Sequence, residues 1–128
     1  MEVPILKQGP YLIATIQTAL NDTDLLELQD ALVSRVGTLR SRAVIIDVTS
    51  LDVMDSFSSR TLRDIAHMIR LRGAETLIVG IQPEVAFSMV QLGLTLEGIA
   101  TALDLEEGLE YLDRNRSVSK KGIGSRGP

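Results

Sequence analysis

The sequence predicts an α/β fold in which helices pack on a mixed β-sheet of four to five strands. Two apolar runs, residues 43–48 and 76–81, are typical of central strands that are buried on both faces. Helical patterns separate the two runs, and a helix between neighbouring parallel strands implies a right-handed crossover. About four helices are expected in all, packed on the sheet.

The first part of the chain predicts two strands and a helix. Residues 11–16 form one strand, and residues 3–6 form a short strand before it, which Pro4 confines to a sheet edge or a strand start. The acids of residues 21–24 mark a helix start, with Asp22 as the expected cap. Apolar residues then recur at steps of three and four along one helix face: Leu25, Leu28, Leu32, Val36 and Leu39.

The second part alternates helices with strands. A helix is expected from Asp55 or Ser56 to about Gly73, a residue type that commonly follows a helix end. Its apolar face is made by three residues: Leu62, Ile65 and Ile69. After strand 76–81, Pro83 suits the first turn of a third helix that reaches about residue 92. A short strand at 101–103 and a last helix capped by Asp104 complete the pattern.

Composition excludes several classes of protein. The 128 residues fit one domain, and 45% are hydrophobic, which is enough for a core. The chain has no cysteine, so disulfides, thiolate catalysis and cysteine zinc sites are excluded. No signal-peptide pattern is present, and no apolar run approaches the ~18 residues of a membrane span. We therefore expect a cytoplasmic protein that does not bind membranes.

Charge is distributed unevenly along the chain. Residues 1–113 hold all 17 acidic residues and eight basic ones, a net charge of −9, whereas residues 114–128 hold five basic residues. The acidic body argues against nucleic acid as the main partner. The segment 114–128 is rich in Gly, Ser and basic residues, so we expect a folded domain over 1–113 followed by a disordered basic tail.

Acidic and hydroxyl side chains are concentrated in residues 47–56, where a buried strand leads into the second helix. The segment holds three acids and three hydroxyl residues: Asp47, Asp52, Asp55, Thr49, Ser50 and Ser56. A phosphate on Ser56 would meet backbone N–H groups and the positive end of the helix. From the pattern alone the simpler interpretation remains open, with Asp55 as a helix cap and Ser56 as an ordinary first-turn residue.

Ser56 does not resemble a catalytic nucleophile. A serine hydrolase needs a base, and His67, the only histidine, lies eleven residues along the same predicted helix. At 1.5 Å per residue the two are about 16 Å apart. The chain also has no Gly-x-Ser-x-Gly elbow and no glycine-rich phosphate loop. We therefore expect no enzymatic activity and no cofactor.

A magnesium-binding receiver domain is the main alternative that the acids raise. Asp47, Asp52 and Asp55 could serve as oxygen ligands. A receiver would also need an acidic pair after its first strand and a late lysine, but Gln17 follows that strand and Lys7 is the only lysine before residue 114. We expect no metal site.

The second helix carries four arginines: Arg60, Arg63, Arg70 and Arg72. Two interpretations stay open. The arginines could form a solvated basic face, or they could form a docking surface for an acidic partner.

Six segments, taken in order, resemble the STAS domain, the fold of anti-sigma-factor antagonists. The resemblance is strongest to the small scaffold proteins of bacterial stressosomes. It spans residues 3 to about 112 and rests on these segments: 3–7, 44–50, 54–57, 80–86, 91–94 and 101–109.

The resemblance implies a phosphorylatable serine directly after the aspartate at the start of the second helix, which is Ser56 here. We expect Asp47, Asp55, Phe57 and Arg60 to form its neighbourhood and the kinase-docking surface. Proteins of this type are scaffolds that self-associate and co-assemble with larger sensory STAS paralogues of the RsbR type. They sequester a serine kinase of the RsbT type and release it on phosphorylation, and a phosphatase of the RsbX type resets the serine.

One departure distinguishes subtypes. Simple anti-sigma antagonists follow the phosphoserine with Ser or Thr and then Gly-Leu, whereas Phe57-Ser58-Ser59 follows Ser56 here. This difference favours the stressosome scaffold. The alternative is a free anti-sigma-factor antagonist that binds an anti-sigma kinase.

Overall fold

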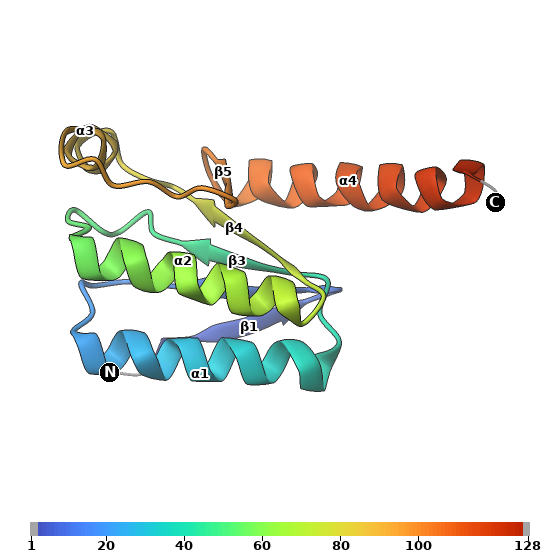
Figure 1. Cartoon of the computed structure of the whole chain (residues 1–128), viewed down its shortest axis with the longest axis horizontal. Coiled ribbons are helices and arrows are strands. Elements are labelled where there is room, and N and C mark those ends of the chain that lie inside the picture. The colour runs from blue at the N-terminus through green and yellow to red at the C-terminus, as the bar shows by residue number, and fades with distance from the viewer. Residues whose placement is uncertain (1–2, 127–128) are drawn as a thin grey trace.

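The computed structural model describes the backbone of residues 3–126 and the side chains of residues 3–115. Strands and helices alternate along most of the chain (Figure 1). Their order and bounds are β1 (Ile5–Gln8), β2 (Tyr11–Thr15), α1 (Asp22–Leu39), β3 (Ala43–Asp47), α2 (Ser56–Leu71), β4 (Glu75–Val79), α3 (Pro83–Gln91), β5 (Ala100–Ala102) and α4 (Leu105–Arg126).

The five strands form one mixed sheet in the order β1-β2-β3-β4-β5. Strand β1 runs antiparallel to β2, and the remaining neighbours are parallel, which confirms the predicted fold class. β1 lies at the edge, as Pro4 predicted, but it begins at Ile5 and extends to Gln8 instead of covering 3–6. Pro4 has no N–H to give to a ladder, and its carbonyl accepts a hydrogen bond from Thr15 just before the strand starts.

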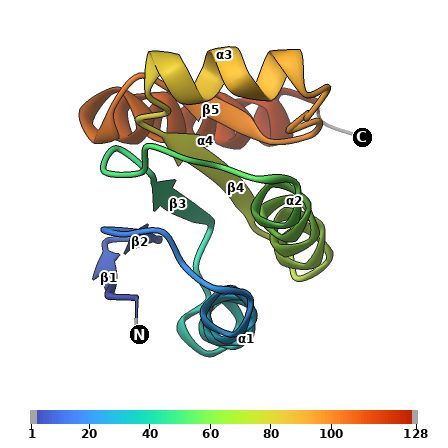
Figure 2. The same cartoon turned by 90° about the vertical axis from the view of Figure 1, so that its left-hand side faces the viewer.

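Side chains alternate between two hydrophobic clusters, one on each face of the sheet. Helices α1 and α2 pack on the face that carries Leu12, Val44 and Ile78, and Val85 and Met89 of α3 join the same cluster. The first turns of α4 cover the opposite face, where Leu112 contacts a second set of strand residues. Figure 2 shows α1 and α2 on one side of the sheet and α3 alongside the loop that enters α2.

Helix α1 differs from the prediction at both ends. Its cap is Asn21 and not Asp22, because Asn21 has the extended backbone and its side chain accepts a hydrogen bond of 2.8 Å from the N–H of Asp24. Leu39, expected on the buried face, is 40% exposed. It is the last helical residue, and the helix ends at Arg40, which has a left-handed backbone with a φ of 51°.

Helix α4 is longer than expected. It continues to Arg126, through most of the segment for which we expected disorder. No proline interrupts residues 105–126, so each added residue can extend the backbone hydrogen bonding of the turns that pack on the sheet. In Figure 1 the helix runs well past the edge of the sheet. The domain boundary near residue 113 stays a prediction, and residues 127–128 lie outside the described part of the chain.

Within residues 3–126, none of the helices combines the length and apolar character needed to cross a membrane.

Candidate phosphorylation site at the start of α2

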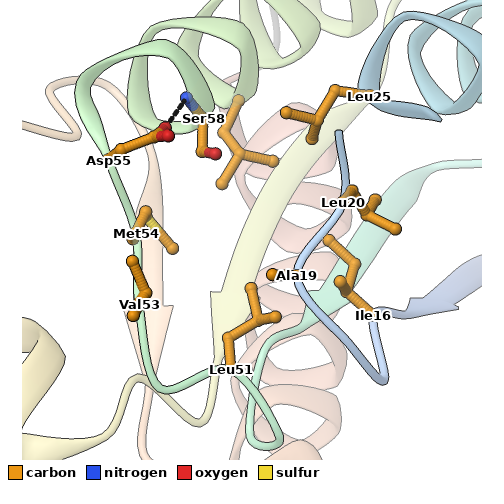
Figure 3. A pocket seen from close by; sticks show the side chains of 10 residues that line it. Ile16, Ala19, Leu20, Leu25, Leu51, Val53, Met54, Asp55 and Ser58 are labelled. Atoms are coloured by element: carbon orange, nitrogen blue, oxygen red, sulfur yellow. Dashed lines mark hydrogen bonds between the residues drawn. The ribbon is translucent and has the colours of Figure 1, made fainter. Parts of the chain in front are cut away.

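Asp55 is the N-cap of α2, as predicted. Its backbone is extended, and its carboxylate accepts a hydrogen bond of 2.8 Å from the backbone N–H of Ser58 (Figure 3). Hydrogen bonds from the backbone and the hydroxyl of Ser58 lower the pKa of Asp55 below its ordinary value. The carboxylate is therefore ionised at neutral pH, directly beside Ser56.

Ser56 is the first residue of α2, and its side chain is exposed. Phe57 is half-buried, and Arg60, one turn further along, is exposed. Ser56 therefore lies exposed at a helix end where backbone N–H groups favour negative charge. The phosphoacceptor role of Ser56 stays a prediction.

Asp47 ends β3 and shapes the first turn of the loop that leads to α2. Its carboxylate accepts hydrogen bonds from Thr49, at 2.9 Å from the backbone N–H and 2.6 Å from the hydroxyl. This is a local turn stabilised by an aspartate side chain. The observed role of Asp47 is therefore to fold the loop, and a role in kinase docking stays a prediction.

A connection that was not predicted joins this loop to the loop that enters α3. The side chain of Gln82, the N-cap residue of α3, donates a hydrogen bond of 2.7 Å to the carbonyl of Thr49. Gly80 lies against the same threonine with a φ of +83°, and a Cβ at that position would stand 2.0 Å from the Thr49 hydroxyl. The sequence did hold a signal for this contact, namely Gly80 directly after a buried strand. A glycine at such a position often marks a place where another backbone segment approaches closely.

The four arginines of α2 do not share one role. Arg70 donates a hydrogen bond of 2.8 Å to the carbonyl of Gly98, so it holds the segment before β5. The guanidinium of Arg72 lies over Gly37 of α1, where a Cβ would be 1.8 Å from its Nη2. Arg63 is half-buried, whereas Arg60 is exposed close to Ser56. Of the four, Arg60 is therefore the one that is exposed within one turn of Ser56, and its role in docking a kinase stays a prediction.

The candidate site has no arrangement of a known catalytic type. His67 is exposed on α2, eleven residues beyond Ser56 along the same helix. Among the residues that the structure describes, no group of three or more His, Asp or Glu side chains could hold a metal ion.

Comparison with known proteins identifies the class. The family described as STAS domain matches residues 3–108, and the chain belongs to this family. A solved structure of a serine-to-glutamate variant of RsbS from Moorella thermoacetica is 32% identical, with a TM-score of 0.78, and covers 90% of this chain and 97% of that one. A chain in a structure of the stressosome, described as a signal integration and transduction hub, is 32% identical, with a TM-score of 0.73, over 88% of this chain and 98% of that one.

A curated relative adds a second kind of similarity. The RsbT co-antagonist protein RsbRA of Bacillus subtilis (strain 168) is 32% identical over 83 residues, which are 65% of this chain and 30% of the relative. The chain therefore spans about three tenths of the length of this relative. These similarities confirm the predicted resemblance to STAS scaffolds of the stressosome type.

Proposed function

We propose that this chain is a non-enzymatic scaffold of a stressosome-type assembly in a stress or sigma-factor signalling cascade. It holds a serine kinase of the RsbT type and releases that kinase when Ser56 is phosphorylated. The observation that supports the proposal is the exposed hydroxyl at the capped start of α2, in a chain that resembles RsbS over nine tenths of its length.

The proposed switch is electrostatic. A phosphate on Ser56 adds nearly two negative charges beside the ionised carboxylate of Asp55. The helix N-terminus offsets part of the added charge, so the fold tolerates the modification. A kinase surface that fits the neutral hydroxyl then faces a dianion, at a cost of about 1–3 kcal/mol in binding free energy. Phosphorylation thereby weakens the complex without unfolding the scaffold.

The proposed partners follow from the relatives. RsbRA is described as an RsbT co-antagonist, and it aligns over 83 residues with this chain, whose residues 3–108 match the STAS domain. We propose that the chain co-assembles with such sensory paralogues and with copies of itself through like domains. A phosphatase of the RsbX type resets Ser56. The scaffold acts in the cytoplasm without a cofactor, nucleic acid or membrane.

Mass spectrometry after incubation with a purified RsbT-type kinase and ATP tests the switch. We expect one phosphate on Ser56, none on the Ser56→Ala variant, and unchanged labelling of Ser50→Ala, which alters an exposed hydroxyl in the same loop. If Ser56→Ala still released the kinase after ATP was added, the proposed switch would be wrong.

Size-exclusion chromatography separates the scaffold from the free antagonist. Mixed with a purified RsbR-type paralogue, a scaffold elutes in one large particle that contains both chains. A free antagonist elutes as a monomer or dimer with or without the paralogue.

A further inference from the structure

A small cavity of about 60 Å³ opens beside the start of α2. Figure 3 shows its two walls, which come from segments that are distant in sequence. Ala19 and Leu20, between β2 and α1, line one wall, and Val53 and Met54, just before α2, line the other. Asp55 and Ser58 border the cavity where α2 begins.

The size and lining of the cavity restrict what could occupy it. Sites for small molecules and cofactors are usually about 300–1,000 Å³, and a buried cavity that holds benzene has about 150 Å³. A cavity of about 60 Å³ is too small for either and suits one short aliphatic side chain. Asp55 and Ser58 are already hydrogen-bonded to each other, and the rest of the lining is apolar, so the occupant needs no polar group.

The position of the cavity indicates which protein would supply that side chain. Ser56 lies between Asp55 and Ser58 in the first turn of α2, and both of these residues border the cavity. A kinase that phosphorylates Ser56 must cover the surrounding surface, and a stable protein interface buries about 800 Å² on each partner. The mouth of the cavity therefore falls within the kinase footprint. Side chains that fill such pockets carry much of the binding energy of an interface.

We propose that this cavity is the anchor site for one aliphatic side chain of the kinase that acts on Ser56, an inference that rests on the proposed function. The same geometry couples the anchor to the switch. A phosphate on Ser56 stands next to the mouth of the cavity and keeps it hydrated, so the aliphatic side chain can no longer be buried there without desolvating a dianion. Release of the kinase then follows from modification one residue away from the cavity wall.

Ala19→Leu tests the anchor because it fills the cavity from the exposed β2–α1 segment without altering Ser56 or Asp55. Isothermal titration calorimetry measures the affinity of the unphosphorylated chain for a purified RsbT-type kinase. We expect the Kd of Ala19→Leu to rise at least tenfold while its midpoint of urea unfolding stays at the wild-type value. Val53→Thr, an isosteric change at a residue that is 63% exposed, should raise the Kd several-fold by placing a hydroxyl at the mouth.

Ser34→Leu is the matched control, because it adds a leucine at an exposed position of α1 outside the cavity. Its Kd should equal that of the wild type. If folded Ala19→Leu bound the kinase with wild-type affinity, the cavity would not be an anchor site, and the proposed function would still stand. The same would follow if Ser34→Leu lost as much affinity as Ala19→Leu. Phosphorylation of wild-type Ser56, read separately by mass spectrometry, tests the proposed function itself. A wild-type chain that neither binds the kinase nor is phosphorylated overturns both.

Discussion

The hydroxyl of Tyr11 on β2 donates a hydrogen bond of 2.5 Å to the carboxylate of Asp113 on α4. The two residues are 102 positions apart in the sequence, and the bond is partly buried. Tyr11 itself is 4% exposed, and Leu112, next to Asp113, is 3% exposed in the same hydrophobic cluster. The bond therefore joins the end of the packed part of α4 to the start of a central strand.

Tyr11→Phe should lower the free energy of unfolding by about 1 kcal/mol, because it removes the donor and keeps the ring. The loss stays small since Asp113 is exposed and water can replace the donor. Chemical unfolding monitored by circular dichroism measures the change. Tyr111→Phe is the control: Tyr111 is a half-buried tyrosine of the same helix, and its change should stay within about 0.5 kcal/mol of the wild type. Equal losses of unfolding free energy in both variants would mean that the Tyr11–Asp113 bond adds no more stability than the hydroxyl of Tyr111.

Gly80→Ala should destabilise the fold by more than about 2 kcal/mol. A positive φ costs an L-residue about 1–2 kcal/mol, and here the new Cβ also meets the Thr49 hydroxyl at 2.0 Å and the Thr49 Cα at 3.0 Å. The threonine can relieve the clash only by moving the loop that leads to Ser56. Urea unfolding measures the stability of the variant.

Gly73→Ala separates the two costs. Gly73 has a φ of +87°, but nothing lies within 4 Å of its added Cβ, so only the conformational cost of about 1–2 kcal/mol remains. The difference in unfolding free energy between Gly80→Ala and Gly73→Ala therefore measures the cost of the clash at residue 80. Equal destabilisation would show that Thr49 gives way freely and does not fix the loop.

Much of the fold could be predicted because its local signals agree. β3 and β4 are buried on both faces, and that burial leaves continuous apolar runs in the sequence. The bounds of β1 could not be predicted, because its register depends on pairing Ile5 with Ala14, a contact across the sheet. The cap of α1 was missed since Asn21 and Asp22 are both good cap residues, and the backbone angles of Asn21 decide between them.

The candidate site was predictable to the extent that it is local. Asp55 as the cap and Ser56 as the first helical residue follow from neighbouring positions along the chain. The bond between Gln82 and Thr49 joins two loops 33 residues apart, and no spacing rule predicts it. The cavity has the same origin, because its two walls meet only after α1 and α2 pack on the sheet.

Asp55→Ala should lower the free energy of unfolding by about 1 kcal/mol at pH 7, the usual cost of losing a helix cap. Asp55→Asn keeps a side-chain acceptor for the N–H of Ser58, so its free energy of unfolding should fall by only about a few tenths of a kcal/mol. Thermal and urea unfolding of the two variants measures both values. If Asp55→Asn were as unstable as Asp55→Ala, the hydrogen bond would not be the source of the stability.

The cap should also make stability depend on pH. The pKa of Asp55 is lower in the folded chain than its ordinary value of 3.8, so its contribution is fully present above pH 3.8 and is lost as the pH falls through the folded pKa. Asparagine does not titrate. The stability of the wild type relative to Asp55→Asn should therefore be constant near neutral pH and decline in acid. Urea midpoints measured in parallel from pH 7 to pH 3 check this, and a constant difference over that range would contradict the lowered pKa.

Ser56→Glu should separate the effect of charge on the fold from its effect on the partner. A carboxylate in the first turn of a helix gains about 0.3–1 kcal/mol from the helix dipole, and Coulombic repulsion from the neighbouring carboxylate of Asp55 opposes that gain. We therefore expect unfolding free energies within about 0.5 kcal/mol of the wild type. Affinity for an RsbT-type kinase should fall about tenfold, because the added charge lies inside the proposed contact surface.

Ser34→Glu is the control, because it adds the same charge at an exposed position of α1, outside α2. Its affinity for the kinase should change less than twofold. The loss of affinity in Ser56→Glu should persist at raised salt if the added charge acts at close contact and not through the overall field of the protein. Equal losses in the two variants at low salt that vanish together at high salt would mean that net charge alone weakens binding. In that case the start of α2 would not be the place where the kinase reads the modification.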